Sequence, residues 1–165
     1  MKVSNIVISG KFSNVINLRS IPNCVYRPER FSGGVIGHCN CTFLLFTNGS
    51  FVCLGATSKA IAANAIKSLG KFLNSKILKC GIKNMVMSHK VKFEIDLIKL
   101  YEMLRKLKKY VVYEDELFNG IVWKDNGGTI RLFHNGSFFV TGLRSVHATE
   151  LLCRDVCRFC WVCKK

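Results

Sequence analysis

Residues 44–54 read LLFTNGSFVCL, and residues 131–141 read RLFHNGSFFVT. The shared segment NGSF begins at Asn48 in the first stretch and at Asn135 in the second, which is 87 residues later. An Asn-Gly pair between two apolar runs predicts a β-hairpin closed by a two-residue turn. The sequence therefore predicts the same hairpin twice, as expected of an internal repeat.

The repeat covers most of the 165 residues. The offset of 87 residues also relates other residues in the same order: Tyr26 to Tyr113, Phe31 to Phe118, Phe46 to Phe133 and Gly55 to Gly142. Nearer the start of each copy the offset is 79 residues, as for Asn5 and Asn84, because the second copy has room for a longer helix. We therefore predict two copies of one unit, at 4–77 and 83–163, which together form one domain.

Each copy is predicted to contain a strand, a helix, a run of strands and a closing helix. The closing helices are expected to begin after Ser58 and Ser145, which are favourable N-cap residues. Pro22 is expected to end the early helix of the first copy. Apolar residues at helical spacing predict two buried helix faces: Ile61, Ala65, Ile66, Leu69, Phe72 and Leu73 in the first copy, and Leu97, Leu100, Tyr101, Leu104 and Leu107 in the second.

The strands around Asn48 are apolar on both faces. Alternation places Phe43, Leu45, Phe51 and Cys53 on one face and Leu44, Phe46, Val52 and Leu54 on the other. Helices usually cover only one face of an antiparallel sheet in an α+β fold, so the second face is predicted to be an exposed apolar binding surface. A sheet buried on both faces is the alternative, and it would need more helices than this sequence predicts.

The charge of the chain points to its partner. Lys and Arg number 25 against 10 Asp and Glu, which gives a net charge of +15 and a pI near 9.7. This excess predicts a polyanionic partner, most simply nucleic acid, whereas a merely basic surface is the alternative. The apolar runs are far shorter than the roughly 20 residues that cross a bilayer, so no membrane partner is expected. The N-terminus lacks a secretory segment, and an odd count of nine cysteines predicts reduced thiols in the cytosol or nucleus.

No pattern in the sequence predicts catalysis, a metal or a cofactor. Four cysteines near the C-terminus have the spacing of one helical face: Cys153, Cys157, Cys160 and Cys163. One helix cannot bring four sulfur atoms to a single zinc ion, so these residues are predicted to be buried and apolar in role. We therefore expect neither an enzyme nor a small-molecule substrate.

Each copy also resembles the core of the TATA-box-binding protein family. The first copy carries YRPERF at 26–31 and LLF at 44–46, followed by VCLGA at 52–56, and the second carries YEDELFNG at 113–120, Phe133 and Thr141-Gly142. These motifs occur twice, in order, at the repeat spacing of that family, over about residues 4–160. The resemblance implies a curved antiparallel sheet, or saddle, with helices on its convex face and DNA under its concave face.

The resemblance also implies roles for single residues. The phenylalanines that wedge between base pairs map to Phe31, Phe46, Phe118 and Phe133, for which a place in the core is the alternative. The central asparagines map to Asn5 and Asn84, whose amides can donate to acceptors in the minor groove of A·T pairs. The other implied DNA contacts are Val7, Leu44, Val52, Leu54, Val86, Lys124, Arg131, Phe139, Thr141 and Arg144.

Partners follow from the same resemblance. The acidic loop that holds transcription factor IIB maps to Glu114, Glu116 and Leu117, and a factor of the IIA type is implied as well. The implied location is the nucleus, or the transcription compartment of a virus and its host if the source is a virus.

The sequence departs from the family pattern at two positions of interest. The family's paired threonine is kept as Thr141 but replaced by Leu54, and an apolar residue is kept as Leu44 but replaced by Arg131. The main hypothesis is a general transcription initiation factor that binds and bends A/T-rich promoter DNA through the minor groove and recruits factor IIB and RNA polymerase. The alternative is an interaction scaffold that binds general transcription factors without specific DNA binding.

Overall fold

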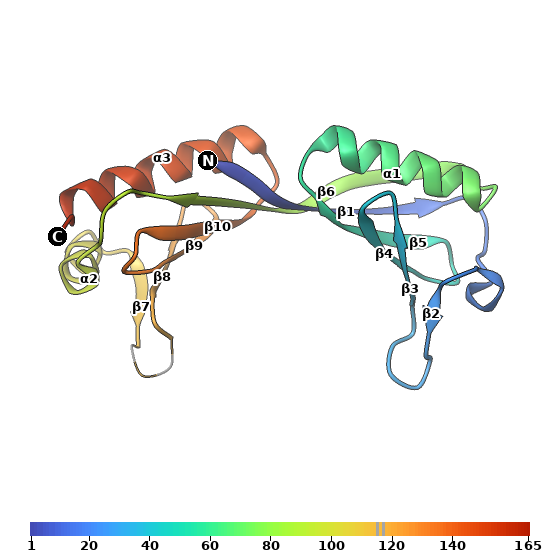
Figure 1. The fold of residues 1–165 in the computed structure, drawn as a ribbon, viewed down its shortest axis with the longest axis horizontal. Coiled ribbons are helices and arrows are strands. Elements are labelled where there is room, and N and C mark those ends of the chain that lie inside the picture. The colour runs from blue at the N-terminus through green and yellow to red at the C-terminus, as the bar shows by residue number, and fades with distance from the viewer. Residues whose placement is uncertain (115, 117) are drawn as a thin grey trace. The chain divides into compact units, whose positions relative to one another are not determined.

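A computed structural model describes residues 1–114, 116 and 118–165. These residues form an α+β fold in which strands and helices follow one another in two similar series (Figure 1). The first series is β1 (Lys2–Phe12), the 3₁₀ turn η1 (Leu18–Ser20), β2 (Val25–Tyr26), β3 (Gly34–His38), β4 (Cys41–Leu45), β5 (Ser50–Ala56) and α1 (Lys59–Phe72). The second is β6 (Ile77–Lys90), α2 (Leu97–Lys106), β7 (Tyr110–Tyr113), β8 (Ile121–Asp125), β9 (Gly128–Leu132), β10 (Ser137–Leu143) and α3 (Val146–Val162).

The chain divides into two compact units, one of residues 4–84 and one of residues 1–3 with 85–165. The strand order in the first unit is β2-β3-β4-β5-β1-β6, and in the second it is β6-β10-β9-β8-β7. The hairpin strands pair antiparallel in both units, and their register repeats, since Leu44 lies opposite Val52 and Arg131 lies opposite Phe139. The predicted fold class, an α+β fold of two repeated antiparallel units, is confirmed.

Helices lie along one face of each sheet. Helix α1 packs against β5 and α3 packs against β10, as Figure 1 shows for each unit, while α2 packs against β7. Both predicted N-caps are confirmed, because Ser58 Oγ accepts a hydrogen bond of 3.1 Å from the Ile61 amide and Ser145 Oγ accepts one of 3.4 Å from the Ala148 amide. These local caps fix where each closing helix begins.

The predicted helix faces are partly wrong. Helix α1 buries Ala62, Ala65, Ile66 and Leu69, whereas Ile61 is 41% exposed and Phe72 is 50% exposed. The buried stripe therefore begins one residue later than predicted, at a small alanine. In α2 the predicted leucines are buried except Leu107, which is 52% exposed because it is the C-cap, beyond the last helical turn.

The early helix of the first copy is reduced to the single turn η1. Asn17 caps it, with its Oδ1 accepting a hydrogen bond of 3.2 Å from the Arg19 amide. Ile21 is already extended, as expected of a residue that precedes a proline. Pro22 therefore ends this helix as predicted.

The hairpins contain two kinds of turn. Cys39 and Asn40 form a two-residue turn with positive φ at both residues, and Asn126 and Gly127 form the same turn in the second unit. The Asn48-Gly49 hairpin is different, and the prediction of a two-residue turn there is wrong. The Phe46 amide donates to the Ser50 carbonyl at 2.9 Å across a three-residue loop in which Gly49 has φ +84°.

Candidate nucleic-acid interface

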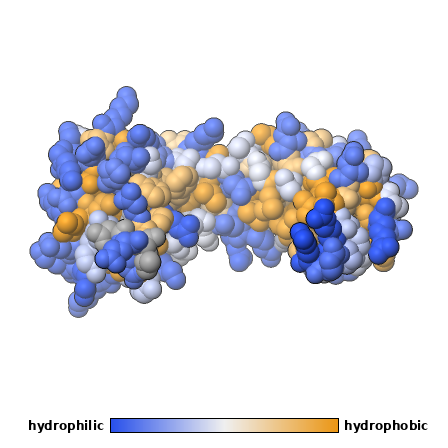
Figure 2. Space-filling view, turned by 60° about the horizontal axis from the view of Figure 1, so that its bottom comes forward, coloured by the Kyte–Doolittle hydropathy of each residue, from blue (hydrophilic) through white to orange (hydrophobic). Residues whose placement is uncertain are grey.

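The two faces of each sheet differ in burial as the alternation predicted. On the helix side Phe43, Leu45, Phe51 and Cys53 are at most 1% exposed, while Leu44, Phe46, Val52 and Leu54 on the opposite face are half-buried. The second unit repeats this pattern, because Ile130 and Leu132 are fully buried and Arg131 between them is exposed. Figure 2 shows apolar side chains over both units and hydrophilic side chains at their margins.

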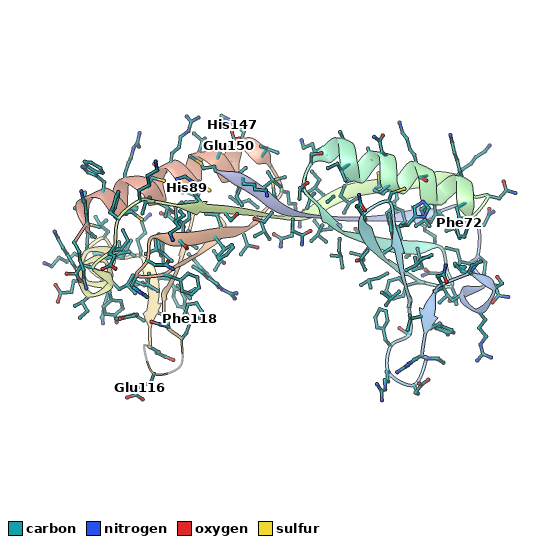
Figure 3. The ribbon with its side chains drawn as sticks, in the orientation of Figure 1. Phe72, His89, Glu116, Phe118, His147 and Glu150 are labelled. Atoms are coloured by element: carbon teal, nitrogen blue, oxygen red, sulfur yellow. The ribbon has the colours of Figure 1, made fainter. Side chains whose placement is uncertain are left out.

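The four phenylalanines predicted as wedges form one pair in each unit. The ring of Phe31, which precedes β3, lies 5.7 Å from that of Phe46, which follows β4. The ring of Phe118, in the segment that joins β7 to β8, lies 5.4 Å from that of Phe133, and Figure 3 labels Phe118 in this segment. None of the four is fully buried, and Phe31 is 38% exposed. The alternative placement of these rings in the core is therefore wrong.

A glycine lies under each phenylalanine pair, and the sequence analysis missed both. A Cβ atom on Gly33 would lie 2.6 Å from a ring carbon of Phe31, and one on Gly120 would lie 2.9 Å from Phe118 and 3.2 Å from Phe133. A residue with a side chain at either position would therefore displace a ring, so the observed packing of the rings requires glycine at both. The offset of 87 residues between Gly33 and Gly120 is the signal that could have identified them.

The outward strand face of the first unit is aliphatic. Leu44 of β4 lies between Val35 of β3 and Val52 of β5. Leu54, further along β5, lies opposite Thr42. This surface has little capacity for hydrogen bonds, so it suits the apolar floor of a groove or another apolar ligand.

The same face of the second unit is more polar. Arg131 lies between Val122 of β8 and Phe139 of β10, and the Phe139 ring lies 6.4 Å from that of Phe133. Thr141 follows on β10 and is half-buried. Arg131 and Phe139 are both exposed, so a guanidinium and an aromatic ring replace the leucine and valine of the first unit.

The central asparagines lie on β1 and β6. Asn5 Oδ1 accepts a hydrogen bond of 2.8 Å from the Gly55 amide, at the irregularity in the β1–β5 register. The backbone amide can only donate, so this bond fixes the Asn5 oxygen inward and leaves its NH₂ group as a donor. Asn84 is half-buried on β6, and Val7 and Val86 are the next outward residues after the two asparagines.

Two lysines extend this line of outward residues, and the sequence analysis missed them. Lys11 on β1 lies opposite Ser50, and Lys90 on β6 lies opposite Ser137. They are related by the same offset of 79 residues as the two asparagines, which is the signal that marks them. In the first unit Lys11 lines a hollow of about 610 Å³ together with Phe46 and Val52.

The predicted basic contacts of the second unit lie on β8 and just after β10. The Lys124 ammonium lies 5.4 Å from the centre of the exposed Tyr110 ring at the β7 edge. Arg144 is exposed in the segment between β10 and α3. Lys124 lies opposite Thr129, and Thr129 lies opposite Thr141, which precedes Arg144 by three residues. Both basic side chains therefore lie toward the same end of the strands, where an anionic ligand could meet them.

The acidic loop lies between β7 and β8. Glu114 and Glu116 are exposed, and the Glu114 carbonyl accepts a hydrogen bond of 2.8 Å from the Phe118 amide. Figure 3 shows Glu116 at the tip of the loop. Leu117 lies outside the described residues.

The C-terminal cysteines lie along α3 and at its C-cap, and the prediction that they are buried is confirmed for three of the four, because Cys157 is half-buried. Cys153, Cys160 and the C-cap residue Cys163 are fully buried. Burial raises the pKa of the Cys153 thiol to about 11 and that of Cys160 to about 12, so both stay neutral thiols at ordinary pH. Within the described residues no group of three or more His, Cys, Asp or Glu is placed to hold a metal ion. No helix in that part of the chain has the length and apolar character needed to cross a membrane.

Comparisons with known proteins agree with this arrangement. A family model described as "Transcription factor TFIID (or TATA-binding protein, TBP)" matches residues 1–76 and 79–159. The TATA-box-binding protein of Methanocaldococcus jannaschii is 30% identical over 159 residues, covering 88% of this chain and 85% of that protein. The TATA-box-binding protein of Tetrahymena thermophila is 29% identical over 157 residues, covering 87% of this chain and 63% of that protein, so the chain spans less than two thirds of this relative.

Structural similarity extends over nearly the whole chain. The solved structure of Methanococcus jannaschii TBP matches with a TM-score of 0.80 and 27% sequence identity, covering 96% of each chain. The family model matches both repeats and almost every residue of this sequence. The chain therefore belongs to the TATA-binding protein family of transcription factors.

Proposed function

We propose that this protein is a general transcription initiation factor that binds and bends A/T-rich promoter DNA through the minor groove. The observation that carries the proposal is the pair of phenylalanines in each unit, held outside the core at repeat-related positions (Phe31 with Phe46, Phe118 with Phe133). Apolar rings of this kind can wedge between base steps and replace part of the stacking that the bases lose.

Other residues complete the interface. The Asn5 NH₂ group can donate to adenine N3 or thymine O2, the acceptors that an A·T pair presents in the minor groove. Asn84 and Val86 are assigned the matching role on β6, and Val7, Leu44, Val52 and Leu54 would meet the groove floor. The surplus of positive charge on the chain, with Lys11, Lys90, Lys124 and Arg144 near the interface, favours phosphate contacts around it.

The proposal extends to protein partners. Glu114, Glu116 and Leu117 are assigned to a partner of the factor IIB type, and a IIA-type factor and RNA polymerase are expected in the same assembly. Exposure of Glu114 and Glu116 leaves their carboxylates available to a basic partner surface. The proposed location is the nucleus or a viral transcription compartment, with no catalytic step, small-molecule substrate or membrane involved.

The experiment is selection of bound sequences from random duplexes, read together with a bending assay on the selected site. The double variant Phe46→Ala, Phe133→Ala should bend DNA much less while its thermal stability changes little, because neither ring is in the core. The matched control is Phe72→Ala, an equally drastic truncation of an exposed ring on α1, which should bend DNA normally. A loss of about 3–5 kcal/mol of stability in the double variant, as for a buried phenylalanine, would contradict the assignment of faces.

A scaffold function is the second candidate, and the changes at Leu54 and Arg131 favour it. A leucine cannot make the hydrogen bond of a threonine, and an arginine alters the apolar floor of one unit. A scaffold would bind a factor IIB partner without DNA and would select no sequence from the random pool. The first candidate requires an enriched A/T-rich sequence from the same pool.

A further inference from the structure

Helix α3 has an extra turn that α1 lacks. The helices begin at repeat-related residues, Lys59 and Val146, but α1 has 14 residues and α3 has 17. The added residues end in Trp161 and Val162, which are 68% and 56% exposed, whereas the first copy has Asn74 and Ser75 at these positions. Both units carry the same set of hairpin strands without needing this turn in the first copy, so the extra turn serves something other than the repeated strand structure.

Trp161 is exposed, but its position is fixed by neighbours. Its ring lies 5.7 Å from that of Phe93 in an edge-to-face arrangement. The Lys164 ammonium lies 5.6 Å from the Trp161 ring centre and 5.4 Å from that of Phe93, within cation–π range of both. Because these contacts already restrict the Trp161 side chain, it loses little conformational freedom when a partner covers it.

The segments around the ring are tied to each other. The Asp96 amide donates to the Cys163 carbonyl at 2.9 Å, and the Lys165 amide donates to the Glu94 carbonyl at 3.1 Å. Ile95 and Lys164 form an isolated antiparallel bridge. The aromatic notch of Phe93, Trp161 and Lys164 is therefore a built surface on two segments far apart in sequence.

The charge around the notch is mostly positive. Three exposed lysines lie on the two segments that form the notch: Lys92, Lys164 and Lys165. The exposed Glu94 lies on the same segment as Lys92. Burial raises the pKa of the Cys163 thiol, the Lys99 ammonium opposes that rise and the Asp96 carboxylate adds to it, so one cation and one anion of the α2 start lie near this end of α3. Arg158 is one turn earlier and is paired with Asp155 at 3.1 Å. A complementary partner must therefore combine apolar side chains with carboxylates.

We propose that the aromatic notch docks an acidic amphipathic helix of a partner protein, with an apolar side chain against Trp161 and carboxylates over Lys92, Lys99 and Lys164. Tryptophan is among the residues that most often dominate binding energy at protein interfaces. An apolar helix face packed into a hydrophobic surface is a common mode of peptide recognition. The positive rim selects helices whose polar face is acidic.

The experiment uses the full chain and a fluorescein-labelled synthetic peptide of about 18 residues, long enough to be helical, with Leu and Phe on one face and Glu on the other. Binding should raise the anisotropy of the label and shift Trp161 emission to the blue, while Trp123, which is fully buried, contributes a constant background. Trp161→Ala should weaken peptide binding about 30-fold. Leu151→Ala, a truncation of an exposed residue on the same helix, should leave the affinity unchanged.

Several outcomes would overturn the proposal. Equal binding of a peptide with Lys in place of Glu would show that the positive charge of the notch does not contribute to recognition. Unchanged affinity of the Trp161→Ala variant would show that the Trp161 ring does not contribute. A blue shift on anionic phosphatidylserine vesicles without peptide binding would assign the notch to a lipid surface. Self-association in sedimentation that Trp161→Ala abolishes would assign it to a second copy. The Trp161→Ala variant should bend DNA like the wild type, so this test does not depend on the proposed DNA binding.

Discussion

At the scale of single residues, two glycines set the geometry of the phenylalanine pairs. A Cβ atom on Gly33 would meet the Phe31 ring and would lie 3.0 Å from the Leu45 carbonyl oxygen. The Leu45 carbonyl is part of the strand backbone and cannot shift without disturbing the strand. The Phe31 ring would therefore have to move. The packing of each phenylalanine pair thus depends on a neighbouring glycine that has no Cβ atom.

We predict that Gly33→Ala lowers DNA bending and costs about 1–3 kcal/mol of stability, as overpacking does. The matched control is Gly37→Ala on the adjoining strand, where an added Cβ meets no heavy atom within 4 Å. That control should be neutral or gain about 0.5–1 kcal/mol, because alanine loses less entropy than glycine on folding. Chemical denaturation and a fluorescence bending assay measure both effects. Normal bending by Gly33→Ala would show that the pair does not depend on this glycine.

A second prediction at this scale concerns Arg131, which lies between the apolar residues Val122 and Phe139 on the outward face of the second unit. Arg131→Leu restores the residue type found at Leu44 in the first unit. If the guanidinium meets a phosphate, the slope of log affinity against log salt should fall by about one, with equal weakening on all sequences. If it meets base edges, the cost should be about 1–3 kcal/mol and confined to one half of the site. Unchanged affinity and salt slope would favour the scaffold function.

At the scale of elements, the three-residue hairpin loops decide where Phe46 and Phe133 emerge. The Asn48 side chain accepts a hydrogen bond of 2.9 Å from the Ser50 amide, and Asn135 accepts one of 3.0 Å from Ser137. This side-chain bond bends the chain locally and favours the longer loop. Each phenylalanine is the residue that opens the loop, which keeps its ring at the end of the sheet.

Two glycines with positive φ, Gly49 in the loop between β4 and β5 and Gly55 within β5, give a test of the first loop. Gly55 has φ +88°, and a Cβ atom added there would have open space around it, with its nearest neighbour 3.9 Å away, so Gly55→Ala should cost about 1–2 kcal/mol from backbone strain alone. Gly49 has φ +84°, and a Cβ there would also lie 2.7 Å from the Asn14 carbonyl oxygen. Gly49→Ala should therefore be clearly more destabilising than Gly55→Ala in thermal or chemical unfolding. Equal costs would mean that the loop can move away from Asn14.

Local signals explain what the sequence could predict. Ser58 and Ser145 cap their own helices, and the alternation around Asn48 reports which residues are buried, so both predictions held. Loop length was mistaken because Asn-Gly is compatible with two- and three-residue loops, and the Asn48 side chain decides between them. Phe72 and Leu107 were misplaced because helical spacing does not reveal where a helix passes the edge of its sheet. Gly33 and Lys11 were missed because their roles depend on neighbours in space.

At the scale of the whole molecule, the two repeats differ in charge and in surface chemistry. Glu29 is the only acidic residue between residues 4 and 84, whereas the remaining acidic residues all lie in the second copy. Leu44, Val52 and Leu54 make the first outward face aliphatic, while Arg131, Phe139 and Thr141 replace them in the second. Under the proposed function, a single DNA site would thus meet two unlike surfaces and be bound in a preferred direction.

The direction follows from the chemistry of guanine. Its N2 amine is the extra donor that a G·C pair places in the minor groove, and Leu54 offers it no acceptor, whereas the Thr141 hydroxyl oxygen can accept. An unpaired buried donor costs about 1–3 kcal/mol, so a site with one G·C pair should be bound with that pair under the second repeat, with a preference of roughly five- to 150-fold. Energy transfer from a dye on the exposed Cys39, in a Cys80→Ser background, to either end of the duplex measures the orientation. The exchange Leu54→Thr, Thr141→Leu keeps composition and net charge and should reverse the preference. If the exchanged protein keeps the original direction, these two residues do not set the polarity of binding, and the charge difference between the repeats becomes the remaining cause to test.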